Sequence, residues 1–198
     1  ELPNIASIVL SFFTIVVITN SFNLIDGIDG LAGSLGLITT LIFGTYFYFA
    51  DYLLFSVLAF ALAGSILSFL IYNFSPAKIF MGDTGSLLLG IVNAILVIKF
   101  INVAADPTSK IYFESSAAIG FSILMVPLFD TLRVFGIRLM QRRSPFSPDR
   151  NHIHHFLLDL GFSHKKITLT CTGFSIAFIA LAVALNPVGP TALLLIVF

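Results

Sequence analysis

The chain has 198 residues, of which 58% are hydrophobic and only 10% are charged, and its mean hydropathy is +1.03. Soluble domains carry roughly 25% charged residues, so this composition excludes a soluble globule and indicates an integral membrane protein. The formal net charge of zero leaves no basic surface for a phosphate backbone, so nucleic acid is not expected as a partner. Cys171 is the only cysteine, which excludes an intrachain disulfide and a cysteine-based zinc site.

Apolar segments recur along the chain at about the length of a membrane span, which is roughly 20 residues. They lie at about 2–18, 32–50, 53–73, 86–102, 115–139, 168–186 and 190–198. The predicted fold class is therefore all-α, a polytopic transmembrane helical bundle with six spans and a truncated seventh. We expect one integral-membrane catalytic domain over residues 1–198. Because the chain starts at Glu1 and runs into apolar segments at both ends, we expect a fragment of a longer protein.

Lysine and arginine are distributed unevenly between the two sets of connections. Alternating spans place 20–31, 74–85 and 140–167 on one side of the membrane. That side or its border holds eight of the ten basic residues: Lys78, Arg133, Arg138, Arg142, Arg143, Arg150, Lys165 and Lys166. The positive-inside rule therefore predicts a multi-pass protein of the cytoplasmic membrane whose polar loops face the cytoplasm.

The first of these loops follows an apolar run and carries a regular polar pattern. Asn20, Asn23, Asp26 and Asp29 recur every third residue, a spacing that keeps neighbours on adjoining parts of one helical face. Two glycines interrupt this face and allow a sharp turn or a close approach of the backbone to a ligand. The pattern predicts a metal site or a polar-substrate site at a helix end, with a simple helix terminus and turn as the alternative.

The second loop, residues 72–86, places Asp83 among glycines just before a long apolar segment. An aspartate at this position is also typical of a helix cap, which accepts backbone N–H groups. Together with Asp26 and Asp29 on the same membrane face, Asp83 completes an oxygen-rich set. Such a set suits a hard cation such as Mg²⁺.

The third loop, residues 141–156, contains three histidines and several arginines. His152, His154 and His155 would suit zinc, but the neighbouring arginines favour phosphate as the ligand. Arg150 lies inside the histidine cluster and is therefore the better candidate for binding a diphosphate.

Acidic residues in or beside membrane spans also raise the alternative of a transporter or channel. Asp130 lies near the end of its span with Arg133 one turn away, so an ion pair competes with a role in a site. The acidic residues Asp26, Asp29 and Asp83 lie at span ends rather than near the bilayer midplane. This placement favours an enzyme over a transporter.

Three motifs, NSFNLIDGIDGLAG, NFSPAKIFMGDTGS and PDRNHIHH, stand in this order on the predicted cytoplasmic side. Their combination resembles the polyprenyl-phosphate N-acetylhexosamine-1-phosphate transferase family over roughly residues 15–165. The family includes GlcNAc-1-phosphate transferases that begin O-antigen, enterobacterial common antigen and teichoic acid linkage synthesis, and also the muramyl-pentapeptide translocase. The His-Ile-His-His form resembles the GlcNAc-1-phosphate branch more than the translocase, which usually shows three successive histidines.

The resemblance implies an enzyme that transfers a sugar 1-phosphate, in the first place GlcNAc 1-phosphate, from a UDP-sugar to polyprenyl phosphate with release of UMP. It implies Mg²⁺ as cofactor, with Mn²⁺ as a substitute, and a role in starting cell-envelope polysaccharide synthesis such as that of lipopolysaccharide. The implied partners are UDP-N-acetylhexosamine, undecaprenyl phosphate and the bilayer, with a homodimer as a candidate assembly. Muramyl-pentapeptide phosphotransferase, a transporter and a lipid-diphosphate metallohydrolase are the alternatives.

The resemblance also assigns roles by motif position. Asp83 matches the metal-binding aspartate, Asn23 an asparagine that joins it, and Asp26 an essential carboxylate nearby. The residues that match the uracil-binding region are Asp29, Asn73 and, as a stacking aromatic, Phe80. The residues that match the loop over the diphosphate and sugar are Arg150, His152, His154 and His155. The family also carries an Asp-Asp pair in an earlier loop, and because no Asp-Asp occurs here we expect that N-terminal spans are missing.

Overall fold

The computed structural model describes residues 4–142, 144 and 152–197. The described residues form helices and contain no strand. The helices are α1 Asn4–Ile25, α2 Leu31–Phe49, α3 Leu53–Asn73, α4 Gly82–Ala104, α5 Ser116–Ile123, α6 Met125–Met140, α7 Ile153–Asp159, α8 His164–Ala184, the short 3-10 helix η1 Asn186–Val188, and α9 Pro190–Val197.

Five helices, α1 to α4 and α8, are long and apolar enough to cross a membrane, and α5 with α6 forms a sixth span if the pair is counted as one. The predicted polytopic helical bundle is therefore confirmed. The prediction of one continuous span over 115–139 is wrong, because the chain bends by 85° between α5 and α6. Pro127 explains the break, since its ring would clash with the carbonyl of Ile123, the last residue of α5.

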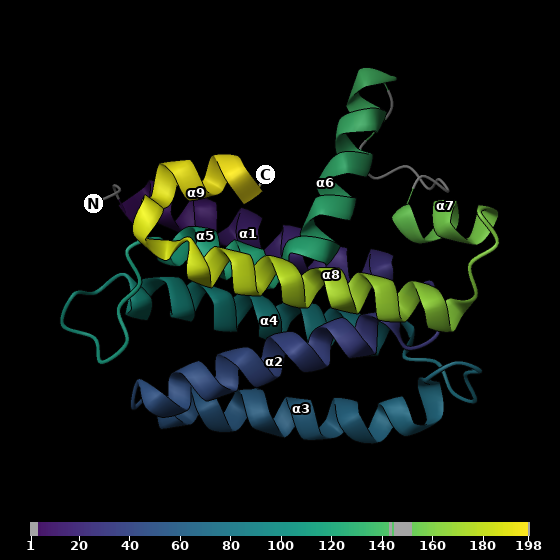
Figure 1. Ribbon diagram of the computed structural model, residues 1–198, viewed down its shortest axis with the longest axis horizontal. Helices are drawn as coiled ribbons and strands as arrows, with labels where there is room; N and C mark the ends of the chain where they lie inside the picture. The colour runs from purple at the N-terminus through teal and green to yellow at the C-terminus, as the bar shows by residue number, and fades with distance from the viewer. Residues whose placement is uncertain (1–3, 143, 145–151, 198) are drawn as a thin grey trace.

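The helices lie side by side with α6 standing away from the others, as Figure 1 shows. α2 packs against α3, and α1 packs against α4. Aromatic rings fill the space between α2 and α4, where the Tyr46 and Phe100 rings meet edge to face with centroids 4.6 Å apart. A buried hydrogen bond of 2.6 Å from Thr39 Oγ1 to Asn93 Oδ1 joins the same two helices. These contacts fix the position of α4, which begins at one end of the bundle.

α1 and α4 approach each other closely because Gly90 has no side chain. A Cβ built on Gly90 would lie 2.6 Å from the Cα of Thr19, a distance that real Cβ atoms essentially never show. The close approach brings the last turn of α1 next to the first turn of α4. Asn23 and Asp83 stand on these two turns.

The connections gather at two ends of the bundle (Figure 1). One end, at the right of the figure, carries residues 26–30, 74–81 and 152–163, and we call it the polar end. The opposite end carries residues 50–52, 105–115 and 185–189. The first two loops and residues 152–163 of the third, which the sequence places on one face, therefore do lie at one end, whereas residues 141 and 142 follow α6 away from the bundle. Part of the third loop, including Arg150, lies outside the described residues.

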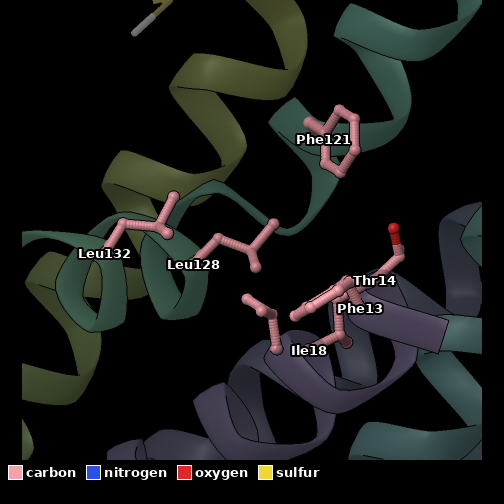
Figure 2. Close-up of a pocket in the computed structure, with 7 residues that line it drawn as sticks. Phe13, Thr14, Ile18, Phe121, Leu128 and Leu132 are labelled. Atoms are coloured by element: carbon pink, nitrogen blue, oxygen red, sulfur yellow. The ribbon is translucent and has the colours of Figure 1, made fainter. Parts of the chain in front are cut away.

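An apolar pocket of about 350 Å³ lies where α6 turns away from the bundle. Its lining comes from α1, α5 and α6: Phe13, Thr14, Val17, Ile18, Phe121, Leu128 and Leu132. Figure 2 shows Leu128 and Leu132 of α6 across the pocket from Phe13 and Ile18 of α1. The bend at Pro127 thus produces an apolar hollow beside α1.

Candidate active site

A second pocket, of about 230 Å³, lies at the polar end. Its lining comes from the end of α1, the 26–29 turn, the end of α3, residues 80 and 81, and the start of α4. Six residues that the sequence analysis names as candidates line it: Asn23, Asp26, Asp29, Asn73, Phe80 and Asp83. The fold therefore brings the first two motifs into one pocket.

Asn23 and Asp83 join α1 to α4 at the edge of this pocket. Asn23 Nδ2 donates hydrogen bonds to Asp83 Oδ1 at 3.2 Å and to Ser86 Oγ at 2.9 Å. The N-cap residue of α4 is Met81, whose side chain makes no capping bond, and Asp83 is exposed. The Asp83 carboxylate therefore faces the pocket and Asn23.

Asp26 is half-buried in the turn that follows α1. Burial, and after it the nearby Asp83 carboxylate, raises the pKa of Asp26 to about 6. Among the described residues that line the pocket there is no lysine or arginine, and two neighbouring carboxylates favour a bound cation, which would neutralise their repulsion. No three side chains of His, Cys, Asp or Glu converge on a common metal position within residues 4–142, 144 and 152–197.

This donor set fits Mg²⁺ better than zinc. Mg²⁺ commonly binds through one or two carboxylates, keeps several waters and takes further oxygens from substrate phosphates. Asp83 and Asp26, with Asn23 beside them, match that requirement. A zinc site made by the three histidines is not supported, because zinc needs at least three protein ligands around one ion and no three such side chains converge in the described part of the chain.

Asp29 lines the same pocket as Asp26 and Asp83, but its carboxylate oxygens are bonded to the protein. Its Oδ2 accepts the N–H of Ala77 at 3.1 Å, and its Oδ1 lies 3.1 Å from Nδ1 of His164. Its backbone carbonyl accepts the Thr168 hydroxyl at 2.8 Å. Partial burial raises the pKa of Asp29, but the bonds from Ala77 and His164 outweigh it and hold the pKa below its usual range.

Asn73, the last residue of α3, is buried and also bonds to the protein. Its Oδ1 accepts the N–H of Gly30 at 2.9 Å, and its Nδ2 donates to the carbonyl of Ile79 at 2.9 Å. Gly30 has a φ of 74°, a left-handed conformation that favours glycine. Phe80 follows Ile79, and its side chain is 80% exposed at the pocket. Asn73 therefore holds the backbone that carries Phe80.

His152 is buried and bonded to a carboxylate on α6. Its Nδ1 lies 2.9 Å from Asp130 Oδ2, and the N–H of Ile153 donates to Asp130 Oδ1 at 2.8 Å. Arg133 pairs with the same oxygen at 3.2 Å. Because an ionised carboxylate only accepts hydrogen bonds, His152 donates from Nδ1. Asp130 thus forms the expected ion pair and also fixes the start of α7.

His154 is 2% exposed and packs against the turn between α1 and α2. A Cβ on Gly27 would lie 2.7 Å from its Nε2, so the absence of a side chain at Gly27 makes room for the imidazole. Burial, and after it the neighbouring His155, lowers the pKa of His154 to about 4. The His154 and His155 ring centroids are 4.4 Å apart. The histidines therefore lie beside the polar pocket, although they do not line it.

The pattern of four polar residues in the first loop holds only in part. α1 continues to Ile25, so Asn20 and Asn23 are helical, whereas Asp26 and Asp29 lie in the turn. Asn20 Nδ2 donates to the carbonyl of Val16 on its own helix at 2.7 Å, so this amide is not part of the pocket. The two glycines turn the chain before a single helical face can form.

His164 and Thr168 contact Asp29 at the polar end, and the sequence does not predict either of them as a site residue. Ser163 is the N-cap of α8, and His164 and Thr168 contact Asp29 from the first turns of that helix. Predicted topology places His164 on the same membrane face as Asp29. No local motif marks it, because the partner stands 135 positions earlier in the chain.

Residues 1–101 match the family model described as glycosyl transferase family 4. The chain belongs to this family. It is 38% identical over 184 residues to the decaprenyl-phosphate N-acetylglucosaminephosphotransferase of Mycobacterium leprae, covering 85% of this chain and 45% of that relative. It is 36% identical over 189 residues to a probable undecaprenyl-phosphate N-acetylglucosaminyl 1-phosphate transferase of Bacillus subtilis, covering 96% and 51%.

A third family 4 relative is the undecaprenyl-phosphate alpha-N-acetylglucosaminyl 1-phosphate transferase of Escherichia coli. The identity is 29% over 195 residues, which cover 96% of this chain and 51% of the relative. The chain spans about half the length of the curated relatives it matches. The resemblance drawn from the three motifs is confirmed at the level of the family.

Proposed function

We propose that the protein containing this chain transfers N-acetylhexosamine 1-phosphate, and specifically GlcNAc 1-phosphate, from a UDP-sugar to polyprenyl phosphate. The names of the family 4 relatives support the reaction class. The observation that carries the proposal is the polar pocket, in which Asn23 and Asp83 meet beside Asp26 and the exposed Phe80. The pocket thus offers oxygen ligands for a cation–diphosphate and an aromatic ring for a base.

In the proposed reaction a phosphate oxygen of the lipid attacks the phosphorus that is linked to the sugar. A new P–O bond forms to that oxygen, and the bond from this phosphorus to the bridging oxygen breaks. The bridging oxygen leaves as part of UMP. A phosphate monoester with a second pKa of about 6 is largely a dianion at neutral pH, so the attack needs no strong protein base.

Asp83, with Asn23 and Asp26 beside it, would hold Mg²⁺ or its substitute Mn²⁺. When bound, the cation supplies neutralisation of the diphosphate charge and stabilisation of the leaving oxygen. By holding the cation, Asp26 and Asp83 would position phosphates that bare carboxylates would repel, and Phe80 stacks on the uracil. His155 is half-buried and lies beside His154 on α7. In the proposed reaction its imidazole donates a hydrogen bond to the sugar phosphate from the edge of the pocket.

The lipid acceptor needs apolar surface close to the polar pocket. α1 supplies both, because Ile18 lines the apolar pocket of Figure 2 and Asn23 lines the polar one. The two residues are five positions apart, about 7.5 Å along the helix axis. We assign the prenyl chain to the apolar pocket, with its phosphate directed toward Asn23.

We also propose that the polar end faces the cytoplasm, where UDP-sugars are made, and that the chain lies in the cytoplasmic membrane. Eight of the ten lysines and arginines support this orientation. The assembly as a homodimer remains a prediction. A transporter is less well supported, because Asp26 and Asp83 lie at the end of the bundle and Asp130 is paired with Arg133.

The test uses membranes containing the intact parent protein, supplied with undecaprenyl phosphate, Mg²⁺ and UDP-GlcNAc. We expect UMP release together with a lipid-linked sugar product, both dependent on lipid and metal and absent in Asp83→Ala. No UMP from any UDP-N-acetylhexosamine, in protein shown to be folded, would contradict the proposal. Release of free phosphate instead would indicate the lipid-diphosphate hydrolase.

A further inference from the structure

His164 is the first residue of α8, and its side chain is 40% exposed at the polar end. Its Nδ1 lies 3.1 Å from Asp29 Oδ1 and 3.4 Å from the backbone N of Asp29. Nδ1 donates if it carries a hydrogen and accepts if it does not, so it cannot make both bonds at once. The shorter contact is to the carboxylate, where the bond is charge-assisted, so Nδ1–H donates to Asp29.

Asp29 thereby connects three segments that are far apart in the chain. One carboxylate oxygen is bonded to His164 of α8 and the other to the N–H of Ala77 in the 74–81 loop. Thr168, one turn further along α8, donates to the Asp29 carbonyl. Both oxygens of the Asp29 side chain are therefore used by the protein itself. Asp29 is better placed to hold the loops together than to bind a ligand directly.

The position of Phe80 depends on this connection. Its ring is 80% exposed, so side-chain packing contributes little to its placement, and the backbone of the 74–81 loop must supply it. That backbone is held at Ala77 by Asp29, at Lys78 by the carbonyl of Tyr72 and at Ile79 by Asn73. Among these backbone bonds, the one at Ala77 depends on a residue of α8, because His164 contacts the Asp29 carboxylate that makes it.

We propose that His164 is a positioning residue of the nucleotide pocket. It fixes the Asp29 carboxylate, which fixes the 74–81 loop, which presents Phe80 to the base of the donor. The inference rests on the proposed function, because it takes a UDP-sugar as the ligand of this pocket. His164 does not touch the reacting atoms, so its loss affects donor binding rather than the chemical step.

The experiment measures kcat and KM for UDP-GlcNAc in the intact parent protein carrying His164→Ala, His164→Asn or Lys165→Ala. For His164→Ala we expect KM to rise roughly fivefold, as loss of a partly exposed bond to a charged group implies, with kcat within about twofold. His164→Asn restores KM to within about twofold, because the amide nitrogen of asparagine takes the place of Nδ1. Lys165→Ala, which removes an exposed charge next to His164, leaves both constants unchanged.

An unchanged KM in His164→Ala, or a fall in kcat without a rise in KM, would overturn the positioning role. Failure of His164→Asn to restore KM would overturn it as well. If His164→Ala does not accumulate as folded protein, His164→Leu keeps most of the side-chain volume without the donor, and a normal KM there would count against the role. A wild-type protein that releases no UMP would overturn the proposed function, and this inference with it.

Discussion

The two ends of the bundle use similar residues in different ways. At the opposite end, Asp51 forms an ion pair with Lys110, and the N–H and hydroxyl of Ser115 bond to Asn186. At the polar end, Asp26 lies near Asp83, and burial together with that neighbour raises the pKa of Asp26 to about 6. Polar groups at the opposite end connect loops, whereas two carboxylates at the polar end are brought together in a pocket. Stability alone favours the first arrangement, so the second supports the proposal that the polar pocket binds a cation and phosphates.

The largest expected difference between the two ends concerns their aspartates. Asp83→Ala should retain less than about a hundredth of wild-type turnover, because removing one electrostatic stabiliser of the transition state costs roughly 10²–10³ in rate. Asp51→Asn is the control, since asparagine tolerates the positive φ of 65° at this position. It should keep near-normal turnover. UMP release by both variants checks the prediction, and near-normal activity of Asp83→Ala would refute the metal assignment.

The buried His154 makes the stability of the polar end depend on pH. Its folded-state pKa of about 4 lies below the ordinary value of 6.5, so between these two pH values the unfolded chain binds a proton that the folded chain does not. Its contribution to stability is complete above about pH 6.5 and falls as the pH drops toward 4, by roughly 3 kcal/mol at most.

Thermal unfolding in detergent with EDTA, from pH 7.5 to 4.5, measures this dependence. In His154→Asn the unfolding temperature should change less with pH than in wild type, whereas His155→Asn should largely keep the wild-type pH dependence. An equal loss of stability at low pH in wild type and in His154→Asn would show that another group is responsible.

The close approach of α1 and α4 gives the next prediction. Gly90→Val places side-chain atoms against the Thr19 backbone and should destabilise the protein by about 1–3 kcal/mol while separating Asn23 from Asp83. Gly64→Val is the control, because a Cβ at Gly64 meets nothing within 4 Å. The midpoint temperature of unfolding and the rate of UMP release should both fall in Gly90→Val, and neither should fall in Gly64→Val. Equal behaviour of the two variants would contradict the proposed role of the helix contact.

The smallest expected effect separates two exposed aromatic residues. Phe80→Ala should raise KM for UDP-GlcNAc about tenfold, because stacking of a base on an aromatic ring contributes roughly 1–3 kcal/mol. Phe49→Ala removes a 60% exposed ring at the opposite end and should leave KM unchanged. Steady-state kinetics with saturating lipid compare the two variants. An unchanged KM in Phe80→Ala would remove Phe80 from the donor site.

Much of this difference between the ends could be predicted from the sequence. Hydropathy located the spanning helices, the alternation of spans grouped the loops, and the motifs contain six residues that line one pocket. Topology placed Asp26 and Asp83 on the same face, and the family resemblance added Asn23 beside Asp83. These are properties of composition and order, which a sequence states directly.

Other features depend on geometry that hydropathy does not record. An apolar run reads as one span whether or not it bends, although Pro127 gave a local signal for the break at α6. The partners of Asp29 could not be predicted, because His164 and Ala77 reach it only after the helices have packed. The assignment of Arg150 to the diphosphate stays a prediction, since this residue lies outside the described part of the chain.

The most direct test of the cation site measures Mn²⁺ binding to the intact parent protein by electron paramagnetic resonance, with and without UDP-GlcNAc. We expect that UDP-GlcNAc raises the affinity for Mn²⁺, that Asp83→Ala abolishes Mn²⁺ binding and that Asp51→Asn keeps it. Mn²⁺ bound equally well by wild type and Asp83→Ala would contradict the assignment of the polar pocket as the metal and phosphate site.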